Sequence, residues 1–584
     1  MSADVPHVLI LGAGINGCAI ARELALNGVG VCVVDHGDVA SGATAYSSRL
    51  IHGGLRYLEY GEFDLVRESL AERGRLLRLA PQYVRPLELM IPVTSRFGGW
   101  WSAMLKFISR GRFGSTSPSK ARGLWLVRMG LWLYDRYARD SSLPDHATHR
   151  VGGRGAPPVD RMTYRWLCSY WDAQVEYAER FTLALLEDAR AAAEAVGSPF
   201  AVLTYHRARR DGRAVELLPQ RGGGEIRSRR IEPDLIVNAT GASVDRALAD
   251  LSIESPPLMG PTKGSHFVTR SDKLIDALGG HGIYAEASDG RPVFVLPLGD
   301  AVLVGTTDVA FDGPPETAVA SADELTYLAE TVANIFPSIG FSRGDIDFHY
   351  CGVRPLPRSD AANSAGVTRR HALVEHEPIR QNTGENGDER GTEDDNAAPP
   401  AISVIGGKLT TCRALAETVV DRVLERLERS RIATTAERPL PGGESYPDGP
   451  NAVAEVWREL ADRFQLRLEQ VAAVWKLYGT RTKAIFDEVV SASAEYGPLG
   501  VDLDGCDLSE AVARWSIRHE WVRSVDDLVE RRLMLLYHQR LTRGCLRRLA
   551  ELLAEAEVIA AGEVDAEAER SVRRLIEHFG KRVF

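Results

Sequence analysis

A glycine-rich turn near the start of the chain limits the folds open to it more than any other segment. The apolar run Val8 to Leu11 leads directly into the turn Gly12-Ala13-Gly14-Ile15-Asn16-Gly17. A helical pattern from Cys18 to Leu26 and a second apolar run ending at Asp35 complete a β-α-β unit. A G-x-G-x-x-G turn between a strand and a helix is typical of a dinucleotide-binding domain.

The residues of this unit have separate tasks toward a dinucleotide. Gly12 permits the tight turn, Gly14 lets the backbone approach a pyrophosphate, and Gly17 lets the helix pack closely on the strand. The N-terminus of the helix directs amide groups toward the phosphates. Asp35 can accept hydrogen bonds from ribose hydroxyls. The unit predicts a dinucleotide site and leaves NAD and FAD as alternatives.

Two later turns favour FAD. The segment Val237 to Gly241 follows an apolar run, and Ile405 to Thr411 forms a glycine turn before a helix that starts near Arg413. Flavoproteins of the glycine oxidase type use such returning segments to enclose the flavin. We expect the helix N-terminus near Thr410 to stabilise negative charge on reduced flavin. A capping role for Thr410 or Thr411 is an alternative that is compatible with this one.

Length and composition set broader limits. The 584 residues predict two or three domains. The formal net charge of −10 gives no electrostatic basis for binding nucleic acid. The seven cysteines show no C-x-x-C spacing, so we expect neither a metal site nor a thioredoxin-type pair in a reduced, cytoplasmic protein. The sequence lacks a signal-peptide pattern and an apolar run of the ~18 residues that a spanning helix needs.

The element patterns predict an α/β part and a separate helical part. We expect a discontinuous Rossmann-like FAD-binding domain (1–85, 155–245 and 345–430), an antiparallel-sheet substrate domain (86–154 and 246–344) and a helical C-terminal domain (445–584). The C-terminal helical patterns cover 451–464, 467–477, 480–495, 508–518, 525–554 and 564–578. The polar, acidic stretch 376–400 predicts a flexible surface insertion.

Six motifs follow one another along the chain. They are Ser47 to Glu59 (S-S-R-L-I-H-G-G-L-R-Y-L-E), Lys263 to His266, Val304 to Asp308, Tyr350 to Leu356, Gly406 to Thr411 and His519 to Arg523. In this order they resemble the FAD-dependent glycerol-3-phosphate dehydrogenases of the aerobic, quinone-linked type, over residues 10 to about 535. Arg49, where lysine is usual, and Cys412, where an aromatic residue is common, depart from the family pattern.

The resemblance implies a reaction and a set of functional residues. The reaction is oxidation of sn-glycerol 3-phosphate to dihydroxyacetone phosphate, with hydride transfer from C2 of the substrate to N5 of FAD. The catalytic candidates are His266, Arg354 and Lys408, and the substrate-binding candidates are Arg56, Tyr57, Arg354, Arg369 and Lys408. The expected FAD contacts are Gly12, Gly14, Asn16, Gly17, Asp35, Ser47, Ser48, His52, Gly53, Gly54, Leu55, Thr240, Gly241, Gly407, Lys408, Leu409 and Thr410.

Simple chemistry supports these assignments and leaves alternatives. A guanidinium offers a phosphate two parallel hydrogen bonds and a permanent charge, although a surface ion pair is the alternative for each arginine. Histidine titrates near neutral pH, which makes His266 the candidate general base, with His52 as an alternative and a structural role open to both. Lys408 is expected beside the flavin, and a solvated loop lysine is its alternative.

The electron acceptor is less constrained. The resemblance implies a membrane quinone, peripheral contact with the cytoplasmic face of the membrane, and contacts of a homodimer. Tryptophans and basic residues alternate over 98–137, which suits an interfacial segment, and packing against the protein's own core is the alternative. Three other functions stay open: a glycerol-3-phosphate oxidase that uses oxygen, an amine or amino-acid oxidase, and a flavin-binding scaffold or sensor without chemistry.

Overall fold

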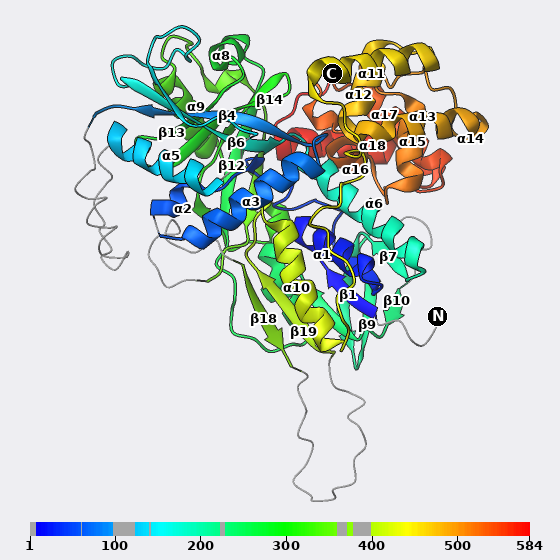
Figure 1. Cartoon of the computed structure of the whole chain (residues 1–584). Helices are drawn as coiled ribbons and strands as arrows, with labels where there is room; N and C mark the ends of the chain where they lie inside the picture. The colour runs from blue at the N-terminus through cyan, green and yellow to red at the C-terminus, as the bar shows by residue number, and fades with distance from the viewer. Residues whose placement is uncertain are drawn as a thin grey trace, which may run out of the picture.

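The computed structural model describes residues 7–59, 61–96, 123–138, 142–221, 228–358, 371–377 and 399–584. Figure 1 shows a sheet covered by helices in the lower half, a larger sheet at the upper left and the C-terminal helices at the upper right. The fold class expected from the sequence is confirmed. The expected insertion 376–400 and the first part of the tryptophan-rich segment 98–137 fall largely outside the described residues.

A six-stranded sheet carries the glycine-rich turn. Its order is β18 (Ala372–His376), β19 (Ala401–Ile405), β11 (Leu235–Asn238), β1 (His7–Leu11), β2 (Gly30–Val34) and β7 (Phe200–Leu203). All neighbours are parallel except β18 and β19. Parallel strands bring their carboxyl ends to one edge of a sheet, and β1 and β2 therefore place Gly12 and Asp35 side by side there.

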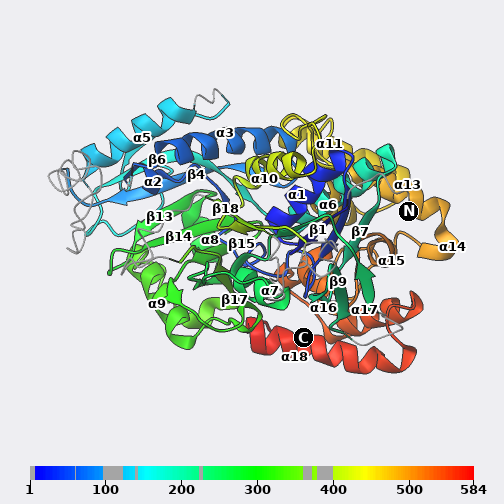
Figure 2. The ribbon, with the colours of Figure 1, turned by 90° about the horizontal axis from the view of Figure 1, so that it is seen from below.

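Helices and a small sheet cover the two faces of this parallel sheet. Helix α1 (Ile15–Leu26) packs between α6 (Ala178–Val196) and α10 (Cys412–Arg426), as Figure 2 shows. The opposite face packs on α7 (Val244–Asp250) and on an antiparallel sheet of β8 (His206–Asp211), β9 (Ala214–Pro219) and β10 (Arg229–Ile231). Burial on both faces explains the continuous apolar runs of β1 and β2.

A ten-stranded, mainly antiparallel sheet forms the second layer. Along the sheet the order is β16 (Val309–Ala310), β12 (Thr262–Thr269), β15 (Ala301–Gly305), β14 (Pro292–Leu298), β13 (Gly282–Glu286), β4 (Val84–Val93), β6 (Trp166–Val175) and β3 (Leu50–Ile51). β17 (Ile346–Arg354) pairs with β12, and β5 (Ala147–Arg150) pairs with β6. The helices associated with this layer are α2 (Leu55–Glu59), α3 (Phe63–Leu79), α5 (Leu124–Ala138), α8 (Asp272–Leu278) and α9 (Ala322–Ile335).

Strand pairing differs from the expected domain boundaries at 155 and 345. β6 pairs with β4, and β17 pairs with β12 from Arg354 to Ile346, so both strands belong to the large sheet and not to the parallel one. β6 extends to Val175, and α6 starts at Ala178. Apolar alternation identifies a strand but does not specify its partner, which tertiary packing selects.

The C-terminal part is helical, as expected. Its helices are α11 (Gly449–Phe464), α12 (Leu468–Tyr478), α13 (Thr482–Ser491), α14 (Ser493–Tyr496), α15 (Glu510–His519), α16 (Val525–Asp527), α17 (Arg543–Glu555) and α18 (Val564–Phe579). The helix expected over 525–554 is wrong. After α16 the chain forms a π-helical turn (Leu528–Arg532), enters the left-handed region at Met534, and starts α17 only after the Thr542 cap.

The interruption has a physical reason. Arg531 and Arg532 both bind Asp38, which lies in the loop of residues 35–49 after β2, here called the β2 loop. Neighbouring residues of a regular α-helix point in different directions, and the wider π turn lets both guanidinium groups reach one carboxylate. Asp38 is 1% exposed. A carboxylate that is buried to this extent destabilises the fold unless cations are paired with it, so both arginines are needed.

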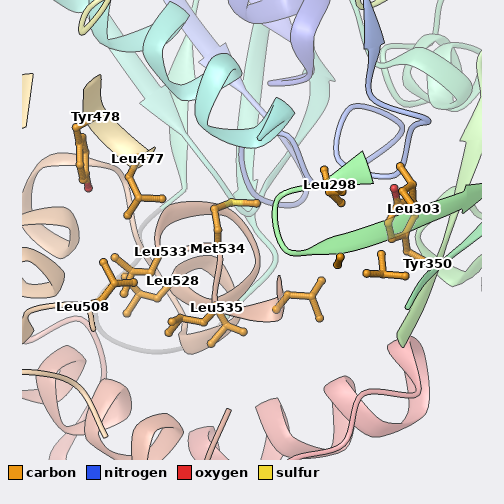
Figure 3. Close-up of a cluster of buried hydrophobic side chains, with 14 of the residues drawn as sticks. Leu298, Leu303, Tyr350, Leu477, Tyr478, Leu508, Leu528, Leu533, Met534 and Leu535 are labelled. Atoms are coloured by element: carbon orange, nitrogen blue, oxygen red, sulfur yellow. The ribbon is translucent and has the colours of Figure 1, made fainter. Parts of the chain in front are cut away.

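One hydrophobic core joins the large sheet to the C-terminal helices. Leu303 of β15 and Tyr350 of β17 belong to the same buried cluster as Tyr478 and Leu528. Figure 3 shows Leu533, Met534 and Leu535 beside Leu528 in this region. Each such side chain contributes about 1.5–3 kcal/mol when fully buried. We therefore expect the two parts to be stable only together.

Among the described helices, none combines the length and the apolar character that crossing a lipid bilayer requires.

A buried ion pair joins the C-terminal helices to α6, which covers the parallel sheet. Arg180 of α6 donates to both carboxylate oxygens of Glu520, at 2.8 and 3.0 Å, and both side chains are fully buried. Tyr478 and Ser516 donate their hydroxyls to the same carboxylate. Burial opposes ionisation of Glu520, whereas Arg180 and the hydrogen bond from Ser516 lower the pKa of its carboxyl below the usual value.

Replacing Arg180 with methionine tests this pair. We expect Arg180→Met to lower the free energy of unfolding by about 3–5 kcal/mol, because Glu520 is left buried without its cation. Urea unfolding monitored by circular dichroism measures the change. The matched control is Arg467→Met, since Arg467 pairs with Asp502 and Asp507 at the surface and should change stability little. Equal effects of the two variants would contradict the role of the buried pair.

Candidate functional site

A cavity of about 1270 Å³ lies where the parallel sheet, the large sheet and the C-terminal helices meet. Most of the residues predicted from the sequence line it. They are Gly12, Gly14, Asn16, Asp35, Ser47, Ser48, His52, Gly54, Leu55, Tyr57, Thr240, Gly241, His266, Arg354, Gly407, Lys408, Leu409 and Thr410. The cavity therefore gathers segments that are separated by hundreds of residues in the chain.

Among the described residues, Gly17 and Gly53 were predicted but are not part of this lining. Gly17 lies behind the turn, where a Cβ atom would be 1.9 Å from the carbonyl oxygen of Gly12. Gly53 faces the core, and its amide donates to the Tyr134 hydroxyl at 2.9 Å. Arg56 lies in α2, but its side chain is outside the described structure. Arg369 lies outside the described residues.

The glycine-rich turn has the shape that a phosphate needs. Gly12 has a φ of 101°, and a Cβ atom there would be 2.6 Å from the carbonyl oxygen of Ala239. A Cβ atom at Gly14 would contact only the Thr44 hydroxyl, at 3.4 Å, so the backbone stays accessible on that side. Asp35 is held by the amides of Ala13 and Gly37, at 2.7 and 2.8 Å. This geometry fits a dinucleotide with its ribose near Asp35.

The turn after β19 closes on the glycine-rich turn. Asn16 donates its side-chain amide to the carbonyl oxygen of Gly406 at 3.3 Å. Its own amide oxygen is buried and has no hydrogen-bond donor within the described residues, which suits a donor on a bound ligand. Gly407 has a φ of 95° and lies so close that a Cβ atom would be 2.5 Å from the Asn16 nitrogen.

The threonines at the start of α10 do not cap it. Thr411 occupies the N-cap without a side-chain capping bond, and Thr410 accepts a hydrogen bond from the His52 amide at 3.1 Å. The capping alternative is therefore wrong for Thr411. Thr410 instead ties the turn after β19 to the segment that carries His52. The N-terminus of α10 keeps its partial positive charge beside the cavity.

Arg354 ends β17 with its guanidinium fixed in the cavity wall. It donates to Asp308 at 2.9 Å, to the Thr306 hydroxyl at 2.8 Å and to the Thr307 carbonyl oxygen at 2.8 Å. A Cβ atom at Gly264 of β12 would be 2.2 Å from this guanidinium. Only glycine at position 264 therefore leaves room for the Arg354 side chain. The sequence motifs contained Thr306 and Asp308, but only the structure relates them to Arg354.

His266 of β12 lies beside Arg354 in the cavity wall. Its ring stacks on Tyr350 with centroids 5.1 Å apart, and its Nε2 is 2.8 Å from the Ser48 hydroxyl. Burial, then the positive charges of Arg354 and Arg49, lower the pKa of His266 to about 3. The imidazole is therefore neutral near neutral pH.

Lys408, Tyr57 and His52 form another group on the cavity wall. The Lys408 ammonium lies 3.8 Å from the centroid of the Tyr57 ring. The rings of Tyr57 and His52 stack with centroids 6.4 Å apart. The cation–π contact gives the ammonium a defined position on the wall.

The sequence did not predict that the C-terminal helices line the cavity. Asp526, Arg531, Arg570, Arg574 and His578 all do so. Arg49 was identified only as a departure from the family pattern, yet it is fully buried and donates to Glu179 at 2.6 and 2.9 Å. The motif His519 to Arg523 was the one available signal, since Glu520 anchors this part to α6.

Comparison with known proteins agrees with this geometry. Residues 7–384 match the FAD dependent oxidoreductase family, and residues 433–558 match the C-terminal domain of alpha-glycerophosphate oxidase. The glycerol-3-phosphate dehydrogenase of Synechocystis sp. is 33% identical over 84% of this chain and 82% of its own. The D-erythritol 1-phosphate dehydrogenase of Brucella abortus is 30% identical over 91% of this chain and 94% of its own.

A solved structure supports the fold over the whole chain. The glycerol-3-phosphate dehydrogenase of Bacillus halodurans, determined in complex with FAD, superposes with a TM-score of 0.67. The alignment covers 99% of this chain and 96% of that one, with 19% sequence identity. The accessible glycine turn, the fixed Asp35 and the buried acceptor of Asn16 fit FAD as the group that the cavity holds. The chain therefore belongs to the family of FAD-dependent glycerol-3-phosphate dehydrogenases, and it is an oxidoreductase that uses FAD.

Proposed function

We propose that the protein oxidises sn-glycerol 3-phosphate to dihydroxyacetone phosphate and that the electrons pass to a membrane quinone. The observation that carries this proposal is the fixed guanidinium of Arg354 in the same cavity wall as His266 and Lys408. FAD, when bound, accepts a hydride at N5. The residues of the chain must bind the phosphate, orient the C2 carbon and take the hydroxyl proton.

Arg354 would bind the phosphate. Asp308 and Thr306 hold its guanidinium in one orientation, which reduces the ordering cost that a flexible arginine would pay on binding. Its planar fork and permanent charge suit a phosphate dianion. In this proposal Arg56 and Arg369 contribute further positive charge to the same pocket, and Tyr57 positions the substrate.

His266 would take the hydroxyl proton. A pKa of about 3 makes it a weak base, and two of the three causes are burial and the charge of Arg354. A phosphate dianion on Arg354 would offset that charge and raise the pKa of His266, which would make it a stronger base only when substrate is bound. The Ser48 hydroxyl, 2.8 Å from Nε2, can relay the proton. Lys408 would stabilise negative charge on the substrate oxygen.

The first test is anaerobic reduction of the purified, yellow protein. We expect glycerol 3-phosphate to bleach the flavin band near ~450 nm, because its phosphate is held by Arg354, and plain glycerol to leave the band unchanged. Faster bleaching by erythritol 1-phosphate would assign the longer substrate instead. If no polyol phosphate reduces the flavin, the family assignment stands and the protein is a flavin-binding scaffold or sensor. Reoxidation by a soluble quinone and by oxygen, compared on the same sample, tests the acceptor.

Replacing Arg354 with lysine tests the phosphate site. Lysine keeps the charge but loses the fork, and we expect kcat/KM for glycerol 3-phosphate to fall about 10- to 100-fold with little loss of bound FAD. Steady-state kinetics with an artificial acceptor, and the flavin absorbance per protein, measure both quantities. The matched control is Arg518→Lys, because Arg518 pairs with Glu495 at the surface of the C-terminal helices. Unchanged kinetics in Arg354→Lys would exclude Arg354 as the phosphate ligand.

Helix α5 supplies the surface that we propose for membrane contact. Trp125, Met129 and Trp132 are 47%, 54% and 59% exposed, and their spacing places them on one face of the helix. Leu124, Val127, Leu131 and Tyr134 are buried on the other face of α5, where they pack against the protein itself. Figure 2 shows α5 at the periphery, beside α3. Exposed tryptophans next to Arg128 suit the headgroup region of a bilayer.

Vesicle binding tests this surface. We expect Trp125→Ser combined with Trp132→Ser to reduce co-sedimentation with vesicles of phosphatidylglycerol and phosphatidylethanolamine at least ~10-fold, because two interfacial anchors are lost. Glycerol 3-phosphate oxidation with a soluble acceptor should not change. The control is Ile432→Ser, which removes an apolar residue that is 72% exposed elsewhere. Undiminished vesicle binding of the double variant would remove α5 from the proposal.

A further inference from the structure

Two cysteines of the C-terminal helices come together although they are far apart in the sequence. Cys506 lies in the loop between α14 and α15, and Cys545 lies in the first turn of α17. The segments that carry them are in contact, and each thiol changes the pKa of the other. The Cys506 thiol donates to the Leu503 carbonyl oxygen at 3.6 Å. Neither residue lines the FAD cavity, and the reaction proposed above uses neither.

The backbone on both sides holds this contact in place. Asp504 accepts a hydrogen bond from the Thr542 hydroxyl at 2.6 Å. A Cβ atom at Gly544 would be 2.6 Å from the same Asp504 carboxylate, and one at Gly505 would be 3.0 Å from the carbonyl oxygen of Arg540. Residues 504 and 505, next to Cys506, are therefore in contact with residues 540–544, next to Cys545. This packing brings the two cysteines close to each other.

The two thiols differ in access and in acidity. Cys506 is partly exposed, whereas Cys545 is 1% exposed. The neighbouring Cys545 lowers the pKa of the Cys506 thiol, whereas Cys506 and burial together raise the pKa of the Cys545 thiol. In the other five cysteines, which all lie within the described residues, the pKa of the thiol is raised above its ordinary value, chiefly by burial.

We propose that Cys506 and Cys545 are a redox-active dithiol that closes to a disulfide when it meets an oxidised low-molecular-weight disulfide. The thiolate of Cys506 attacks one sulfur of that molecule, whose S–S bond breaks and releases one thiolate. Cys545 then gives its proton to a thiolate and attacks the sulfur of Cys506, which releases the second thiol. Two protein thiols are oxidised, and one external disulfide is reduced to two thiols.

The disulfide would fasten the loop between α14 and α15 to the start of α17. The loop is already closed by the bond from the Leu503 amide to the Leu508 carbonyl oxygen, at 2.8 Å. The cross-link also restricts the unfolded chain, which stabilises the folded form. α17 packs on α18, and Arg570 and Arg574 of α18 line the FAD cavity. The modification therefore stiffens the helices that form one wall of that cavity.

Oxidised glutathione is the probe. The FAD-loaded protein is incubated with it, the remaining thiols are alkylated, and peptides are mapped without reduction. We expect one linked pair of peptides, containing Cys506 and Cys545, and the loss of two of the seven thiols in the unfolded protein. Dithiothreitol should restore both thiols. The oxidised protein should melt several degrees above the reduced one, with its flavin absorbance unchanged.

Two serine variants separate the steps. Cys545→Ser should stop at a glutathione adduct on Cys506, because the resolving thiol is missing, and Cys506→Ser should show neither adduct nor cross-link. Cys32→Ser is the matched control and should behave as the unmodified chain, since Cys32 is also only partly buried but has no thiol neighbour in the described part of the chain. An adduct on Cys32 before Cys506, or oxidation without a Cys506–Cys545 peptide in the unmodified chain, would overturn the proposal.

Discussion

The pairing of buried charges between the β2 loop and the C-terminal helices is the constraint on which the rest of the structure depends. Asp38 is surrounded by Arg531 and Arg532 in a region that excludes water. A buried charge that loses its partner costs several kcal/mol, so the β2 loop and the segment after α16 must reach one relative position. The π-helical turn and the left-handed Met534 are the local distortions that this position requires. The cavity is complete only when these pairs have formed.

A second set of charges, on Arg49 and Arg354, connects the cofactor region with the substrate region. Arg49, which is buried against Glu179, belongs to the β2 loop and contributes to the low pKa of His266. Arg354 contributes a second positive charge, and burial has the largest effect. His266 is thus neutral, and a substrate dianion on Arg354 would raise its proton affinity. A polyol without a phosphate would lack both the binding energy and this effect on the base.

The two proposed surface functions use different helices. α5 presents its buried residues to the large sheet and leaves two tryptophans and a methionine exposed on one side. The C-terminal helices are instead covered with surface ion pairs and carry the dithiol of Cys506 and Cys545. In these proposals α5 contacts the bilayer, and the C-terminal helices respond to thiol oxidants. A substitution in α5 should therefore leave the reaction of the cysteines unchanged, and a substitution of either cysteine should leave membrane binding unchanged.

The sequence by itself determined the local elements and their chemistry. Gly12, Gly14, Gly17 and Asp35 predicted a dinucleotide site because the backbone geometry of that turn is a property of a few consecutive residues. The ordered motifs predicted FAD, the family, and the gathering of His266, Arg354 and Lys408 in one cavity.

Tertiary structure decided what depends on partners far along the chain. The pairing of β6 and β17, the clamp of Asp308 and Thr306 on Arg354, and the contact of Cys506 with Cys545 follow no local period. The helix expected over 525–554 is broken because burying two arginines on Asp38 outweighs helix propensity. The periodicity of a sequence shows which face of a helix or strand is apolar. Packing and charge pairing in the folded protein determine which other element that face contacts.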